Sequence, residues 1–118
     1  MFKQKIKFSL IEDYISLLKI DKVLLNCDNY KCLTLYDFNE QLKNSYESLF
    51  LKYGLLNVSL LVLRQEVVNS PYNFCLTLDE VEIMQNKIVN NMLEKFKRLK
   101  LNDVEINFLT KKLNVKNC

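Results

Sequence analysis

The stretch QLKNSYESLFLKYGLLNVSLLVLRQEV, residues 41–67, decides the fold of this 118-residue chain. Its apolar side chains recur at alternating spacings of four and three residues, which is the period of one face of an α-helix. The members of this seam are Leu42, Tyr46, Leu49, Tyr53, Leu56, Leu60, Leu63 and Val67. Between Leu49 and Leu63 the other faces are apolar too, so the pattern predicts one helix, between Tyr36 and Val68, that neighbours bury on nearly every side. A coiled-coil zipper is the alternative, but its outer faces would be polar.

Helix start signals appear four times along the chain. In each, a small polar residue is followed three residues later by an acid, which is the pattern of a capping box. The pairs are Ser9 with Glu12, Thr34 with Asp37, Thr77 with Glu80 and Asn102 with Glu105. They predict four helices, over Leu10–Leu25, from near Leu35, over Asp79 to about Lys100, and from Asn102 to about Leu113.

The fold class follows from these helices and from the scarcity of turn residues. One Gly and one Pro in the whole chain leave little tight-turn chemistry for a sheet protein. The sequence therefore predicts an all-α fold, with about four helices around the long buried helix, that is part of or similar to a helical sandwich. The length fits a single helical domain over residues 1–118.

The charge balance points to no charged partner. The 17 basic and 14 acidic residues leave a net charge of +3, which is too small to indicate direct binding of nucleic acid. The basic N-terminus resembles a signal peptide, but Glu12 and Asp13 interrupt its apolar stretch, so we expect a nuclear or cytoplasmic protein. Lys52 and Asn57 interrupt the central apolar run, which is too short to cross a membrane.

The residue types needed for common catalysis are missing from the sequence. The chain has no histidine, the usual general base, and its single Gly excludes glycine-rich phosphate loops. The paired acids Glu12/Asp13 and Asp79/Glu80 lie at predicted helix starts, where capping explains them. The sequence therefore predicts a protein that is not an enzyme and needs no cofactor.

Four cysteines, Cys27, Cys32, Cys75 and Cys118, allow two disulfides outside the cell or thiols inside it. The missing signal peptide favours thiols. Cys27 and Cys32 are at the edge of zinc-ligand spacing, but no second close pair and no histidine complete such a site. We therefore predict no metal.

Two blocks of the sequence resemble the ligand-binding domains of nuclear receptors, most closely those of the tailless and COUP-type receptors. The first block is Leu33-Thr-Leu-Tyr-Asp37 with Leu42 and Ser45-Tyr-Glu-Ser-Leu-Phe50, which is similar to the signature region of that domain. The second block, residues 96–109, is similar to the stretch between two later helices, with Glu105 and Leu109 in matching places. Phe38 stands where the signature has glutamine, and the resemblance ends before the closing helices, which indicates an incomplete domain.

The resemblance implies a pocket for a small apolar ligand. Its lining would be Leu49, Phe50, Tyr53 and Leu56 of the long helix, with Phe74 and Leu76 of the following loop. The alternative is that these residues fill a core. A partial or divergent receptor domain would act as a regulatory binding or dimerisation module, with a protein partner or a second copy covering its open faces. The other functional hypothesis is a stand-alone, small all-helical protein that acts by protein–protein interaction.

Overall fold

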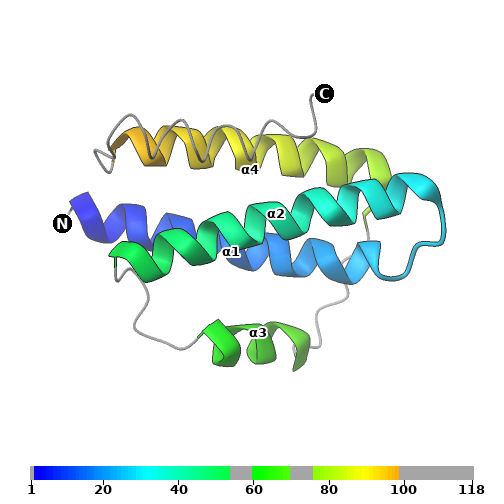
Figure 1. Ribbon diagram of the computed structural model, residues 1–118, viewed down its shortest axis with the longest axis horizontal. Coiled ribbons are helices and arrows are strands. Elements are labelled where there is room, and N and C mark those ends of the chain that lie inside the picture. Colours follow the sequence, from blue (N-terminus) through cyan, green and yellow to red (C-terminus); the bar gives the residue numbers. More distant parts are fainter. Residues whose placement is uncertain (1, 54–59, 70–75, 99–118) are drawn as a thin grey trace.

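The computed structural model describes residues 2–53, 60–69 and 76–98, and it consists of four α-helices (Figure 1). They are α1 (Phe2–Leu24), α2 (Tyr30–Tyr53), α3 (Leu60–Asn69) and α4 (Leu78–Arg98). No strand occurs in these ranges. The predicted all-α fold is therefore confirmed. The helix expected from Asn102, with its capping pair, lies outside the described residues.

The pair formed by α1 and α2 is the middle of the molecule. The two helices run antiparallel, joined by the short connection at residues 25–29, with α4 along one side and α3 along the other (Figure 1). Helix α1 packs against each of the other three helices, and α4 also packs against α2. Helix α1 is thus the one that packs substantially against all three others.

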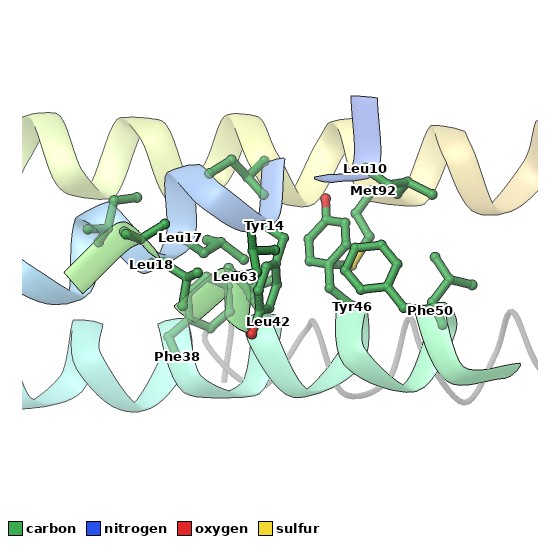
Figure 2. Packing of buried hydrophobic residues seen from close by; sticks show 14 of the residues in the cluster. Leu10, Tyr14, Leu17, Leu18, Phe38, Leu42, Tyr46, Phe50, Leu63 and Met92 are labelled. Carbon is green, nitrogen blue, oxygen red and sulfur yellow. The ribbon is translucent and has the colours of Figure 1, made fainter. Parts of the chain in front are cut away.

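The core lies where α1, α2 and α4 meet. Tyr14, Tyr46 and Phe96 are the largest fully buried side chains. The ring of Phe50 packs edge-on against Tyr14, with centroids 5.6 Å apart, and at a tilt against Tyr46 at 6.1 Å (Figure 2). Edge-on aromatic pairs add to the free energy that burial itself contributes. This cluster fixes the crossing of α1 and α2.

The prediction of a single helix between Tyr36 and Val68 is wrong. The structure has two elements there, because α2 ends at Tyr53 and α3 begins at Leu60 and packs against α1. Gly54 directly follows the last residue of α2. A glycine in the interior of a helix destabilises it by about 1 kcal/mol relative to alanine. Leu63 and Val67 are buried, but Leu61 is 72% exposed, so α3 is not covered on every side.

Two of the predicted helix starts are also wrong. Ser9 lies inside α1, which already begins at Phe2. The N-cap of α2 is Asn29, whose Oδ1 accepts a hydrogen bond of 2.9 Å from the Cys32 backbone amide. Thr34 lies one turn inside α2 and its hydroxyl donates to the Tyr30 carbonyl at 3.2 Å. Both residues had an acid three positions later, but residues upstream already form the helix.

The start of α4 agrees with its capping box. The Glu80 amide donates to Thr77 Oγ1 at 3.2 Å, and the Thr77 amide donates to Glu80 Oε1 at 3.3 Å. The two groups thus satisfy each other's otherwise unpaired amides. Val81, Ile88, Met92 and Phe96 share one face of α4 and are at most 6% exposed, and Met84 on the same side is partly buried.

Candidate functional site

Two reciprocal tyrosine–carboxylate pairs join α1 and α2 at their crossing. The Tyr14 hydroxyl donates to Glu47 Oε1 at 2.5 Å, and the Tyr46 hydroxyl donates to Asp13 Oδ2 at 3.1 Å. Asp13 and Tyr14 are neighbours in α1, and Tyr46 and Glu47 are neighbours in α2. Each helix therefore gives one donor and one acceptor, and the two pairs set the register of the crossing.

Each of these carboxylates also holds one flanking helix. Lys95 of α4 forms an ion pair with Asp13, and Arg64 of α3 forms one with Glu47. Arg64 Nε also donates to the Tyr14 hydroxyl at 3.0 Å. We call these two groups the α4 clamp (Asp13, Tyr46, Lys95) and the α3 clamp (Tyr14, Glu47, Arg64).

The α4 clamp is better shielded from water than the α3 clamp. The side chains of Lys95 and Asp13 are 12% and 15% exposed, whereas that of Arg64 is 46% exposed. Burial and the nearby Asp13 carboxylate raise the pKa of Tyr46 well above its usual value. Tyr46 therefore stays a protonated hydrogen-bond donor at neutral pH, which is a structural role.

A second polar cluster lies further along the same pair of helices. Lys43 of α2 forms ion pairs with Asp21 of α1 and with Glu40 one turn away. The fully buried Asn39 side chain donates to Asp21 and, at 2.9 Å, to the Leu17 carbonyl. Among the described residues, Asn39 Oδ1 is buried without a hydrogen-bond partner.

Burial is the largest influence on the pKa values of Asp21 and Lys43 in this cluster, and their hydrogen bonds and ion pairs oppose it. Burial raises the pKa of Asp21, and the bonds from Lys43 and Asn39 offset this only in part. For Lys43 burial alone would lower the pKa, but hydrogen bonds and attraction from Asp21 and Glu40 raise it. Lys43 therefore stays charged, and Asp21 takes up a proton more readily than an exposed aspartate does.

A cavity of about 260 Å³ opens beside this cluster, between α1, α2 and α3. It is lined by Leu18, Asp21, Lys22, Leu25, Glu40, Lys43, Arg64 and Val67. Lys22 Nζ donates to the Val67 carbonyl at 2.5 Å across its edge. Lys43 and Arg64 each form an ion pair with a carboxylate of the chain, so neither is available to bind an anionic ligand in this cavity.

The six residues expected to line an apolar pocket divide between the core and the parts not described. Leu49 and Phe50 are 3% and 2% exposed and belong to the core, and Leu76 packs against it. The side chain of Tyr53, and Leu56 and Phe74, lie outside the described residues. Of the three members whose side chains the structure describes, Leu49, Phe50 and Leu76, none lines the cavity between α1, α2 and α3. The ligand-binding role of these residues stays a prediction.

The sequence analysis missed the charged and amide residues between α1 and α2. A signal was present, because Asn39 and Lys43 share the face of α2 that carries Leu35, Leu42 and Tyr46. Polar residues on a buried face require partners on the opposite helix. Asp21, inside the predicted first helix, was the natural candidate for such a partner.

Comparison of the chain with protein-family models, curated proteins and solved structures found no match. The resemblance to nuclear-receptor ligand-binding domains therefore stays a prediction from the sequence motifs. None of the helices in the described ranges combines the length and apolar character that crossing a membrane requires. Within the same ranges, no three metal-ligating side chains gather in one place.

Proposed function

We propose that this chain is a non-enzymatic helical interaction module that binds a second copy of itself through α3. The observation that carries the proposal is the exposure of two consecutive apolar residues on the outer side of α3. Leu61 is 72% exposed and Val62 is 47% exposed, while Leu63 and Val67 pack the other side of the helix onto the core. Helix α3 thus has apolar surface on both sides.

The position and charge of α3 favour self-association. The helix lies at the edge of the molecule, outside the α1–α2 pair (Figure 1). Arg64 and Glu66 are its only charged residues, so α3 has no net charge, although the whole chain carries +3. A two-fold axis would place the same face of two copies together, and two neutral helices would not repel each other there.

Helix α4 provides the contrast that makes the proposal testable. Its outer face also exposes one large apolar residue, Ile83, at 67%. Ile83 is surrounded at helical spacing by the exposed polar residues Asp79, Glu80, Asn86 and Lys87. A single apolar side chain in a polar face is ordinary protein surface.

The test is the mass of the full chain in solution, measured by size-exclusion chromatography with light scattering over a range of concentrations. We expect the wild-type chain to approach twice 14.1 kDa as the concentration rises. The double variant Leu61→Lys/Val62→Lys should remain at the monomer mass, with an unchanged melting temperature, because both positions are on the outer side of α3.

The matched control is Ile83→Lys, which places the same charge at a similarly exposed apolar position on α4. We expect this variant to associate like the wild type. A wild-type chain that stays monomeric at every concentration contradicts the proposal. So does a double variant on α3 that still forms the dimer.

A further inference from the structure

The connection between α1 and α2 brings two cysteines together. Cys27 lies within it, three residues after the end of α1, and Cys32 lies in the first turn of α2. Backbone bonds hold both ends, since the Cys27 amide donates to the Leu24 carbonyl at 3.2 Å and the Cys32 amide donates to the Asn29 carbonyl at 3.1 Å. The cap from Asn29 Oδ1 fixes the Cys32 backbone further.

The two thiols differ in their access to water. Cys27 Sγ donates to the Val23 carbonyl at 3.3 Å and is partly exposed, whereas Cys32 is 1% exposed. A hydrogen bond with the Cys32 thiol is the main cause that raises the pKa of Cys27, and burial adds to it. At neutral pH Cys27 is therefore mostly in the thiol form, which is the less reactive one.

We propose that Cys27 and Cys32 form a reversible disulfide by exchange with a low-molecular-weight disulfide such as oxidised glutathione. The argument is the placement of an accessible thiol five residues before a buried one, where the chain reverses between two antiparallel helices and its backbone is held at both cysteines. Cys27 is the residue that an external disulfide can reach, and Cys32 is the residue that can only react with Cys27.

The reaction takes place in two exchange steps. The Cys27 thiolate attacks one sulfur of the oxidised glutathione, the glutathione S–S bond breaks, and the first glutathione leaves. The Cys32 sulfur then attacks Cys27 Sγ in the mixed disulfide, the Cys27–Cys32 bond forms, and the second glutathione leaves. The two protein thiols lose two electrons and two protons, and both are recovered in two reduced glutathione molecules.

The product joins the end of α1 covalently to the first turn of α2. Such a link removes conformations from the unfolded chain, so it stabilises the folded protein if the native geometry accepts it. The α1–α2 pair is the middle of the fold, and oxidation should therefore raise the melting temperature of the whole chain.

The experiment uses the full chain with Cys75→Ser and Cys118→Ser, so that only the proposed pair can react. After equilibration with oxidised and reduced glutathione, the intact mass and the disulfide-mapped peptides are measured. We expect the loss of two hydrogen atoms from the monomer, a peptide linking Cys27 to Cys32, and a higher melting temperature than that of the reduced form.

Single variants in this background separate the two roles. Cys32→Ala should stop at a stable glutathione adduct on Cys27, and Cys27→Ala should leave the buried Cys32 unmodified. The proposal is overturned if the pair stays reduced while a small dithiol in the same buffer is oxidised. It is equally overturned if disulfides form only between chains, or if Cys32 reacts first.

Discussion

Helices α4 and α3 pack on opposite sides of the same α1–α2 pair, and they are held there in very different ways. Each is fixed by one basic side chain that reaches a carboxylate already bound by a tyrosine. Helix α4 also buries five side chains, whereas Leu63 and Val67 are the buried ones among the side chains of α3 that the structure describes. Each side has one such clamp, so we attribute the larger part of the difference in attachment to the apolar area removed from water.

The polar contacts around the two helices also favour a firmer attachment of α4 than of α3. On the α4 side, Gln85 is the buried polar residue, and its Nε2 donates to the Leu35 carbonyl at 3.0 Å. The ion pairs of Lys31 with Asp79 and Glu82 add a link between the starts of α2 and α4. On the α3 side lie the Asp21–Lys43 pair and the cavity. We infer that α4 belongs to the cooperative core and that α3 is a lightly attached outer layer.

The largest expected effect comes from shortening a core side chain on each side. Phe96→Ala should cost about 3–5 kcal/mol of unfolding free energy, because Phe96 is fully buried and leaves a large cavity. Leu63→Ala should cost about 2 kcal/mol, the low end for such a change, because Leu63 is 8% exposed and at the edge of the core. Chemical denaturation measures both.

Hydrogen exchange sharpens this first prediction. In the Leu63→Ala variant the amides of α3 should lose protection while those of α4 keep it, since a lightly attached helix opens locally. In Phe96→Ala protection should fall together in α1, α2 and α4, which exchange by global unfolding, and change less in α3, which opens locally. Equal losses of free energy in the two variants, or uniform exchange in Leu63→Ala, would show that α3 is part of the core.

The two clamps give the next effect in size. Lys95→Ala should cost about 1–3 kcal/mol, because it leaves the Asp13 carboxylate shielded from water without its cation. Arg64→Ala should cost less than about 1 kcal/mol, since nearly half of the Arg64 side chain is in water. Urea denaturation at low and high salt checks both values.

Salt provides the control for the clamps. Raising the ionic strength screens exposed charges more than shielded ones, so it should shrink the Arg64→Ala effect and leave most of the Lys95→Ala effect in place. If the two variants lose the same free energy, or if Arg64→Ala loses more, the difference in shielding does not decide the strength of the clamps.

The sequence predicted the α4 side of the molecule well and the α3 side poorly. Helix α4 was visible because its capping box and its apolar stripe are both local patterns. The separation of α2 from α3 was not visible, because the apolar spacing continues without interruption through Gly54. A periodic pattern reports which residues share a face, but it does not report where the chain changes direction.

The polar contacts between helices were beyond local patterns for a related reason. Asp13 was interpreted as an acid at a helix start, which is wrong because it lies inside α1, and Asp21 and Glu47 carry no local signal; the partners of all three lie on other helices. Pairing them requires the register of α1 against α2, which is a property of the packed structure. The apolar ligand site inferred from resemblance has its described members in the core, and the rest outside the described ranges.

The smallest expected effect comes from the capping box at the start of α4, which stabilises this helix in addition to its packing. Thr77→Ala removes the hydroxyl that accepts from the Glu80 amide and should cost about 1 kcal/mol. Thr34→Ala is the matched control, because Thr34 has an acid three residues later but lies inside α2, where its hydroxyl only bonds the Tyr30 carbonyl. Its effect should stay within about 0.5 kcal/mol. Melting of both variants by circular dichroism measures the difference, and a larger loss for Thr34→Ala would place the start of α2 at Thr34 and not at Asn29.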